Sequence, residues 1–459
     1  MSLFSYISSR HQQSLDELTE LLRIPSISTA PEHKADILRC AEWLHTHLQQ
    51  IGLEHVQTIT TNGHPAVYGE FCHAGANAPT VLFYGHYDVQ PVDPLNLWTN
   101  PPFEPTVRDG KIYARGATDD KGQVFLQLKA IEAHLKTTNS LPVNVKVLIE
   151  GEEEIGSVHL EQLLTDHREK LQCDYVLISD TSMYAEGKPS LCYGLRGLTY
   201  MEVQVTGPNR DLHSGVFGGA VDNPLNVLCA MIARLKDEYG RMTIPGFYDD
   251  VLPLTEQERT EFARLPFDMK EYCDELNIGA TRGEHGYTVL EQTWARPTLD
   301  VNGIWGGFTG EGAKTVLPAK AQAKISMRLV PNQDTHDIAQ KFEAYFKAIA
   351  PPTVKVEVTH LHGGQPLLTP IESPAMKAAG HALKATYGVD PYLVRGGGSI
   401  PITVLFQQVL NAPCVLMGFG LDSENLHSPD EHFTLVNFYK GIEAGARFYT
   451  ALADIHAQG

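Results

Sequence analysis

Several side chains that could hold a metal ion follow short apolar runs of the sequence. The runs 80–84, 143–149 and 175–178 are each followed by ionisable residues, and a fourth, 414–417, precedes a loop with a histidine. In chain order these residues are His86, Asp88, Glu152, Glu153, Glu154, Asp180 and His427. In an open α/β sheet the carboxyl ends of the strands meet at one crevice, so these groups can converge there. Imidazole and carboxylate groups without a thiolate suit Zn²⁺ or Mn²⁺, which indicates metal-assisted hydrolysis.

Two adjacent aspartates complete this set of candidate ligands. Asp119 and Asp120 stand just before a helical pattern that begins at Lys121. One carboxylate placed between two ions can hold them about 3.5–4 Å apart, as in two-metal hydrolases. The donor set therefore favours two divalent ions over one.

Each of these residues also has an ordinary structural interpretation when it is considered alone. Asp119 or Asp120 could cap the following helix, because a carboxylate accepts the free N–H groups of a helix N-terminus. The acidic run 152–154 could be a solvated turn. His86 or His427, among 20 histidines, could be structural or exposed instead of a ligand. Three strand ends, an aspartate pair and a histidine loop in one chain favour the metal site.

Alternating strands and helices would bring these residues together. Helical patterns occur at 12–22 and 35–51, ahead of the first run. Another over 121–135 separates the first run from the second, and one over 158–169 separates the second from the third. This order implies a parallel sheet covered by helices.

The middle of the chain follows a different pattern. Alternation typical of half-buried antiparallel strands occurs over 198–206, 319–330 and 353–360. Asn223-Pro224 predicts a helix that runs to about residue 238, and helical patterns return after residue 370. We therefore predict an α/β catalytic domain with a mostly parallel sheet, residues 1–197 and 368–459. It would be interrupted by an inserted α+β domain, residues 198–367.

Composition excludes several classes of protein. A chain of 459 residues with 42% hydrophobic and 20% charged residues can form at least one large core. Its formal net charge of −19 would repel nucleic acids and anionic membrane surfaces, so we expect neither as a partner. The seven cysteines are scattered, which indicates neither a disulfide framework nor a thiolate site. Without an apolar run of signal-peptide or membrane-spanning length, we expect a cytoplasmic protein.

Five short motifs of this chain resemble those of a known enzyme family. They are Gly85-His86-Tyr87-Asp88-Val89, Asp119-Asp120-Lys121-Gly122, Gly151-Glu152-Glu153-Glu154-Ile155-Gly156-Ser157, Ser179-Asp180 and Leu426-His427-Ser428. Their order is similar to that in the di-metal exopeptidases and deacylases, a family that includes aminoacylase, acetylornithine deacetylase and the carnosine dipeptidases. The resemblance extends over essentially the whole chain.

Further motifs resemble the branch of cytosolic non-specific and carnosine dipeptidases. They are 211–215, 312–318, 328–332 and 395–401, and the long segment 244–296 is also characteristic of that branch. Glu152 departs from the pattern, which has an uncharged residue there. The resemblance implies a homodimeric dipeptidase whose inserted domain serves as lid and dimerisation domain.

The resemblance also implies a role for each metal-site residue. Asp119 would bridge two ions, with His86 and Asp180 completing one site and Glu154 and His427 the other. Members of the family carry a cis peptide bond between the paired aspartates, so we expect one here too.

The remaining catalytic roles also follow from the resemblance. Asp88 would orient His86, since a ligating imidazole usually donates its other N–H group to an oxygen. Glu153 would be the general base. His213 would enter the active site of the other subunit, contact the substrate and stabilise the oxyanion of the intermediate.

An exopeptidase must recognise a free terminus of its substrate. The resemblance assigns the substrate carboxylate to four residues of the second half of the chain: Arg328, Thr315, Gly398 and Ser399. A guanidinium group suits this task because its planar fork binds a carboxylate through two hydrogen bonds. Our leading hypothesis is therefore cleavage of unblocked dipeptides. The alternatives are an N-acyl amino-acid deacylase of the same family and a catalytically idle scaffold protein.

Overall fold

The computed structural model describes residues 1–398 and 400–458. By their contacts these residues form two compact units. The first comprises Met1–Tyr193, Thr369–Val394 and Ile402–Gly459, and the second comprises Gly194–Leu368 and Arg395–Pro401.

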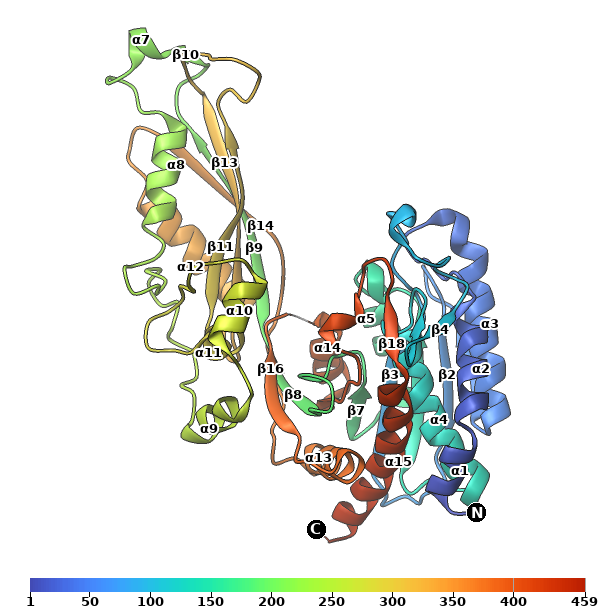
Figure 1. The fold of residues 1–459 in the computed structure, drawn as a ribbon. Helices are drawn as coiled ribbons and strands as arrows, with labels where there is room; N and C mark the ends of the chain where they lie inside the picture. The colour runs from blue at the N-terminus through green and yellow to red at the C-terminus, as the bar shows by residue number, and fades with distance from the viewer. Residues whose placement is uncertain (399, 459) are drawn as a thin grey trace. The chain divides into compact units, whose positions relative to one another are not determined.

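The first unit is built on a mostly parallel sheet (Figure 1). Its strand order is β1-β2-β6-β3-β7-β17-β8. Strands β6, β3, β7 and β17 are parallel to one another, whereas the pairs β1–β2, β2–β6 and β17–β8 are antiparallel. The bounds are β1 Glu54–Ile59, β2 Ala66–Phe71, β3 Thr80–His86, β6 Asn144–Glu150, β7 Tyr175–Ile178, β8 Ser190–Leu195 and β17 Cys414–Leu416. The central strands are buried along nearly their whole length, which explains their continuous apolar runs.

Helices cover this sheet. The longer ones are α2 His11–Leu22, α3 Lys34–Ile51, α4 Lys121–Thr138, α13 Pro374–Tyr387, α14 Pro401–Leu410 and α15 Leu435–Gln458, with short helices α1 Leu3–Ser9, α5 Leu160–Asp166 and α6 Arg168–Leu171. Helix α3 packs against β1 and β2, α4 packs against β3, and α15 packs along α4 and α13. Helix α4 is buried over most of its length, so it is a central element of this unit.

A small sheet joins two distant parts of the chain. Strand β18 (His432–Thr434) pairs with β5 (Lys111–Tyr113), which pairs with β4 (Thr106–Arg108). This pairing places the segment before α4 beside the segment before α15. Both segments carry candidate metal ligands.

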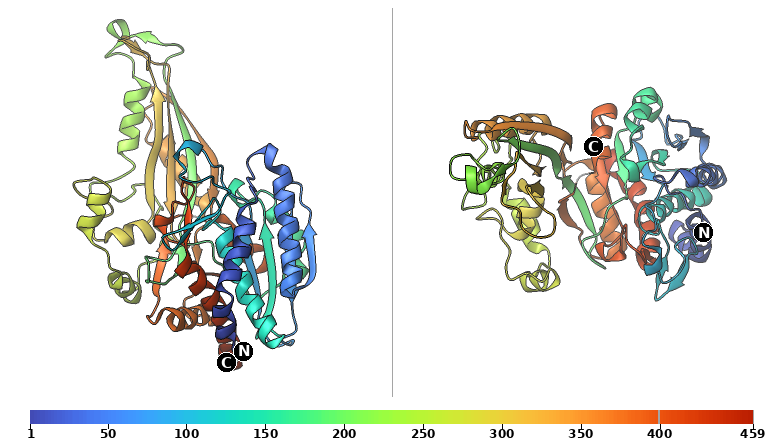
Figure 2. Two further views of the ribbon diagram at one scale, coloured as in Figure 1. Left: turned by 45° about the vertical axis from the view of Figure 1, so that its right-hand side comes forward. Right: turned by 90° about the horizontal axis from the view of Figure 1, so that it is seen from above.

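The second unit is a four-stranded antiparallel sheet with helices on one face (Figure 2). The strands, in spatial order, are β11 Thr298–Gly306, β13 Lys320–Leu329, β9 Gly197–Thr206 and β14 Lys355–Gly364. Alternate residues of β9 and β13 are buried against α8 (Pro224–Ala233) and α12 (Thr335–Ala348). Shorter elements are β10 Leu212–His213, β12 Val316–Leu317, α7 Ser214–Phe217, α9 Glu256–Arg264, α10 Met269–Glu275 and α11 Val289–Trp294.

The structure confirms the predicted α/β class and most of the predicted elements. The helix expected from Asn223-Pro224 begins as predicted, with the Asn223 side chain accepting the Leu225 N–H group, but it ends at Ala233 instead of residue 238. Asp237 accepts hydrogen bonds from the backbone of Tyr239 and Arg241, and this turn competes with the helix. The predicted helix over 158–169 is divided into α5 and α6.

In the part of the chain that the structure describes, helices long enough to cross a membrane are not apolar enough to do so.

Candidate metal centre

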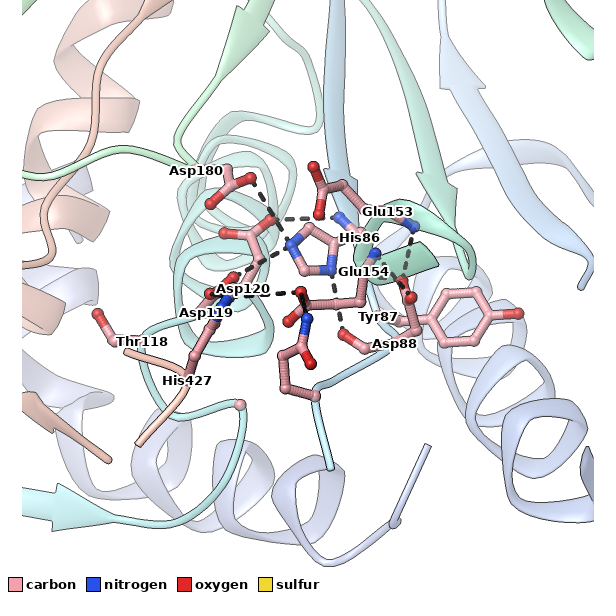
Figure 3. Close-up of polar contacts among 12 residues, drawn as sticks. His86, Tyr87, Asp88, Thr118, Asp119, Asp120, Glu153, Glu154, Asp180 and His427 are labelled. Carbon is pink, nitrogen blue, oxygen red and sulfur yellow. Dashed lines mark hydrogen bonds and ion pairs between the residues drawn. The ribbon is translucent and has the colours of Figure 1, made fainter. Parts of the chain in front are cut away.

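Asp119 lies between two histidines and offers a different carboxylate oxygen to each (Figure 3). Its Oδ1 is 3.2 Å from His86 Nε2 and its Oδ2 is 2.9 Å from His427 Nε2. Asp180 Oδ2 lies 3.7 Å from His86 Nε2, and Glu154 Oε2 lies 3.4 Å from His427 Nε2. The structure therefore brings the five predicted ligands into two groups that share Asp119. Within each group the ligand atoms lie within 4.8 Å of one another.

The electrostatics of this cluster fit divalent cations. Several carboxylates lie around the two imidazoles: Asp88, Asp119, Asp120, Asp180, Glu153 and Glu154. Burial raises the pKa of the Glu153 and Asp180 carboxyl groups, and the Asp119 carboxylate adds to both increases. His86 is fully buried, and its Nε2 makes no hydrogen bond to the described residues. Bound cations would offset the carboxylate charge and use this imidazole nitrogen.

Asp88 is a buried link between two strand ends. It follows β3, and its Oδ1 and Oδ2 accept hydrogen bonds from the backbone N–H groups of Glu153 and Glu154, at 3.2 and 3.1 Å. His86 Nδ1 lies 3.0 Å from the Asp88 carbonyl oxygen and 3.4 Å from Asp88 Oδ1. Asp88 therefore orients the imidazole and the turn after β6 together. Gln90, which was not predicted as a site residue, donates a 2.7 Å hydrogen bond to Glu154 Oε2.

Glu431 holds the loop that carries Asp119. It is fully buried and accepts hydrogen bonds from the backbone N–H groups of Gly116, Thr118 and Asp119 at 3.0–3.1 Å, and from Arg115 Nη1 at 2.8 Å. Glu431 lies on the same loop as His427. It therefore ties the two ligand-bearing loops to each other.

Glu424, which precedes His427 in the sequence, also connects the Asp119 loop to the loop that carries His427. This buried carboxylate accepts hydrogen bonds from Thr118 Oγ1 at 2.9 Å and from the backbone of Leu421 and Thr434 at 2.9 and 2.8 Å. Sequence reasoning missed both Glu424 and Glu431. Their only sequence signal is an acidic residue three or four positions from a candidate ligand, and such residues are common on the surface.

The ordinary structural interpretations can now be compared with the contacts. Asp120 is the N-cap residue of α4, but its side chain makes no capping hydrogen bond and instead accepts the His86 N–H group at 3.2 Å. The Asp119–Asp120 peptide bond is cis, as expected. The acidic run after β6 is not a solvated turn, because Glu152 is buried and Glu153 and Glu154 are half-buried.

Glu152, which departs from the family pattern, makes its side-chain contacts with residues that are not candidate ligands. Its Oε1 accepts the His64 backbone N–H group at 2.9 Å, and its Oε2 lies 2.8 Å from His159 Nδ1. The Glu152 carboxylate is therefore engaged by the hairpin between β1 and β2 and by the residue before α5.

Comparison with known sequences agrees with this centre. A profile of peptidase family M20/M25/M40 matches residues 82–453, which include every candidate metal ligand. The chain belongs to this family.

Relatives within the M20 peptidases match almost the whole chain. The Beta-Ala-His dipeptidase of Homo sapiens is 31% identical over 99% of this chain and 93% of its own length. The Cys-Gly metallodipeptidase dug1 of Schizosaccharomyces pombe is 33% identical over 99% of this chain and 98% of its own length.

Solved structures give the same result. The crystal structure of human carnosine dipeptidase 1 has a TM-score of 0.76 and 32% identity, and covers 98% of both chains. The M20 family metallo-carboxypeptidase Sso-CP2 of Sulfolobus solfataricus has a TM-score of 0.81 and 35% identity, and covers 96% of this chain and 99% of its own.

Other residues predicted for the site belong to the second unit of this M20 peptidase. His213 is exposed on β10, which pairs with β12 so that His213 lies opposite Val316. The backbone N–H of Ser214 donates to the Thr315 carbonyl oxygen at 3.1 Å. His213 and Thr315 therefore lie in neighbouring segments.

Arg328 lies on β13, half-buried, opposite Leu198 of β9 and Thr298 of β11. Arg196, which was not predicted, has its pKa lowered to about 10 by burial and by the neighbouring positive charge of Arg328. Its Nε donates to the Gly397 carbonyl oxygen at 3.0 Å. The exposed Gly398 follows, and the predicted Ser399 lies outside the described residues.

Proposed function

We propose that this M20 peptidase is a metal-dependent dipeptidase that hydrolyses the peptide bond of unblocked dipeptides. The observation that carries this proposal is the position of Asp119, whose two oxygens face His86 and His427, beside Glu153. Two relatives named as dipeptidases, which are 31% and 33% identical over 99% of this chain, support dipeptides as the substrate class.

The five clustered side chains would hold two divalent ions, Zn²⁺ or Mn²⁺. Asp119 would be shared, with His86 and Asp180 on one side and Glu154 and His427 on the other; the two groups of potential ligands support this count. When bound, such ions polarise a carbonyl group and lower the pKa of water towards about 7.

Glu153 would act as the general base. The backbone N–H group of Glu153 donates a hydrogen bond to Asp88. This contact fixes the end of β6 from which the Glu153 carboxylate would face the ligands. Glu153 would take a proton from the attacking water and then give a proton to the leaving amine. Its pKa, raised by burial, supports this exchange, because a carboxyl group that binds a proton more readily can also return one.

Recognition of the substrate carboxylate would fall to the second unit. Arg328 would bind it, together with Thr315, Gly398 and Ser399. The nearby Arg196 supports this assignment, because two neighbouring guanidinium groups create a positive site in a chain of net charge −19.

We further propose a homodimer in which residues 1–197 and 368–459, which include the whole first unit, form the catalytic domain and residues 198–367 form the lid and dimerisation domain. His213 would enter the active site of the partner subunit and stabilise the oxyanion of the intermediate. Its exposure, and the exposed apolar side chains of Val216 (69%) and Phe217 (37%) close to it, support an interface here.

The compartment we propose is the cytoplasm. The buried cysteines Cys40, Cys173 and Cys414 carry free thiols, as expected under reducing conditions.

The test is a metal-reconstitution assay with paired substrates. The chelated and dialysed protein receives Zn²⁺ or Mn²⁺ separately and is given unblocked dipeptides, among them Beta-Ala-His and Cys-Gly, and their N-acetyl counterparts. Amine release is measured. We expect metal-dependent cleavage of the unblocked panel, and the more active ion identifies the working cofactor.

A metallo-carboxypeptidase is a second candidate, supported by the 35% identity and TM-score of 0.81 to Sso-CP2. Release of single residues from the carboxyl end of tripeptides and longer peptides, faster than from dipeptides, would favour it. Cleavage confined to N-acetyl substrates would instead indicate a deacylase. If metal is bound and neither panel nor the longer peptides are cleaved, the dipeptidase proposal is wrong and the scaffold alternative gains support.

A further inference from the structure

A second group of potential metal ligands lies within the first unit, on helices that carry none of the centre described above. Glu17 of α2, His47 of α3 and Glu132 of α4 each offer one ligand atom, and these atoms lie within 4.8 Å of one another. His47 and Glu132 are buried, with 5% and 7% exposure. The group therefore joins three packed helices at one point.

The two carboxylates are oriented by further hydrogen bonds. Tyr6 of α1 donates to Glu132 Oε1 at 3.2 Å, and Gln13 Nε2 donates to Glu17 Oε1 at 2.8 Å. The Oε2 atoms of both carboxylates face Lys129 Nζ. One oxygen of each glutamate thus accepts a hydrogen bond from a neutral side chain, and the other faces the ammonium group of Lys129. Outer hydrogen bonds of this kind orient the ligands of metal sites.

His47 supplies an imidazole with an unused nitrogen. Its ring stacks on Trp43 with centroids 4.9 Å apart and lies 5.1 Å from Phe125, which fixes its orientation. Nε2 is buried and makes no hydrogen bond to the residues that the structure describes. Burial, followed by the charge of Lys129, lowers the pKa of His47 to about 4, so the ring is neutral near pH 7. A neutral imidazole is the form that ligates metals.

The cation now present is the ammonium group of Lys129, which is 6% exposed and forms ion pairs with both glutamates. A cavity of about 10 Å³ adjoins Lys129 and Glu132, close to the space that one water molecule needs. Glu17 is partly exposed, at 24% of its side chain, and gives access from solvent.

We propose that Glu17, His47 and Glu132 form an additional Zn²⁺ site, in which the Lys129 ammonium group takes the place of the metal until Zn²⁺ displaces it. One imidazole, two carboxylates and a water molecule make up a tetrahedral nitrogen and oxygen set that zinc accepts. Because zinc must displace an internal ion pair, this site binds more weakly than the Asp119 centre and fills only when zinc is in excess. The bound ion crosslinks α2, α3 and α4.

The experiment counts zinc on four forms of the protein whose Asp119 centre is already loaded. Wild type, His47→Ala, Lys129→Met and the control Glu20→Gln, an exposed glutamate of α2, are dialysed against increasing free Zn²⁺, and the metal per chain is measured. We expect one additional zinc in wild type and in the control, and none in His47→Ala. Lys129→Met removes the competing cation and should bind the additional zinc at least about ten-fold more tightly, a difference of about 1.4 kcal/mol.

Thermal unfolding gives a second readout that does not depend on activity. Lys129→Met leaves two carboxylates without their cation, so its Tm should be lower than that of wild type and should recover when Zn²⁺ is added. The double variant with His47→Ala should show no recovery. Equal zinc binding by wild type and Lys129→Met, or an additional zinc that persists in His47→Ala, overturns the proposal, and the second result identifies adventitious surface binding.

Discussion

At the scale of single residues, the contacts of Asp119 and Asp88 show that the same type of side chain serves two different purposes. Both oxygens of Asp119 face imidazole nitrogens, whereas both oxygens of Asp88 accept backbone N–H groups. A carboxylate that already accepts two N–H groups has less capacity left for a cation. These contacts fit the positioning role proposed for Asp88 and the ligand role proposed for Asp119. Glu153 differs from both, because the hydrogen bond that it shares with Asp88 involves its backbone N–H group and not its carboxylate.

We expect Glu153→Gln to lower kcat by about 10²–10⁴-fold, the range for loss of a general base. The amide has nearly the same shape but cannot take up a proton, and the backbone hydrogen bond to Asp88 does not involve the substituted atoms. Metal content per chain, measured beside kcat, should stay at the wild-type value. Loss of metal from this variant would make Glu153 a ligand instead of the base.

We expect Glu431→Gln to weaken metal binding by about 10–100-fold, because the amide cannot accept all the hydrogen bonds that hold the Asp119 loop. Metal affinity is measured by competition with a chelator, separately from kcat under metal saturation. Exposed Glu104→Gln is the control for the same chemical change. If metal affinity is unchanged while only the unfolding temperature falls, Glu431 is a stabilising residue and not a positioning one.

At the scale of elements, the approach of α4 to its preceding loop depends on Gly122. A Cβ atom at this position would lie 1.9 Å from the Ala117 carbonyl oxygen and 2.7 Å from Phe433 Cδ1. Gly122→Ala must therefore move the loop that carries Asp119, and we expect it to cost more than about 2 kcal/mol of unfolding free energy. Denaturant titration measures this change.

Gly380→Ala in α13 is the matched control, because nothing lies within 4 Å of its added methyl group. Alanine is favoured over glycine inside a helix, so this change should stabilise the protein by about 0.5–1 kcal/mol. Equal effects of the two substitutions would show that crowding at Gly122 is unimportant.

Packing of α4 against α15 gives a pH prediction. His134 is buried, and its Nε2 donates to the Ala446 carbonyl oxygen at 2.9 Å. Burial lowers its pKa below the ordinary 6.5, with the hydrogen bond to Ala446 opposing part of this decrease. The unfolded chain therefore binds the proton more readily, and stability present above pH 6.5 is lost as the pH falls from 6.5 towards the lowered value.

His134→Gln isolates this effect from the other histidines, since glutamine can still donate to Ala446 but does not titrate. Urea unfolding across the range of about pH 5.5–7.5 should show wild type losing stability relative to the variant as the pH decreases. A constant difference between the two proteins would exclude His134 as the source.

Elements with a strong local signal could be predicted from the sequence. The buried central strands are continuous apolar runs, and α8 begins at an asparagine cap followed by proline. Strand β11 was missed because it is mostly exposed and shows no apolar alternation. Helix α12 was also missed, although the capping side chain of Asp334, which accepts the N–H groups of His336 and Asp337, could have indicated it.

The candidate metal ligands could be proposed because strand order alone predicts that they converge. The contacts of Glu431 and Glu424 could not, because they join the loop before α4 to a loop about 300 residues later along the chain. Lys129 was missed for a related reason. A lysine on a helix usually faces solvent, and only the packing of α2 and α3 shows that this one is buried.

At the scale of the whole molecule, the proposed dimer makes activity depend on two chains. Mixing Glu153→Gln with His213→Ala subunits should restore part of the activity that each variant lacks, because half of the mixed sites would combine an intact Glu153 with an intact His213 of the partner. Activity is measured after subunit exchange has been verified with differently labelled chains. Exchange without recovery would contradict a site shared between subunits.

The central sheet is completed by a strand from the far end of the chain. Strand β17 pairs with β7 and β8, yet more than 200 residues separate Ile178 from Cys414. During synthesis on the ribosome, His86, Asp119 and Asp180 emerge early, whereas His427 emerges only after the whole second unit. Four of the five candidate ligands, Glu154 included, therefore exist in the nascent chain long before the fifth, His427. A cell that makes this protein completes the second group of candidate ligands only after the second unit has been synthesised.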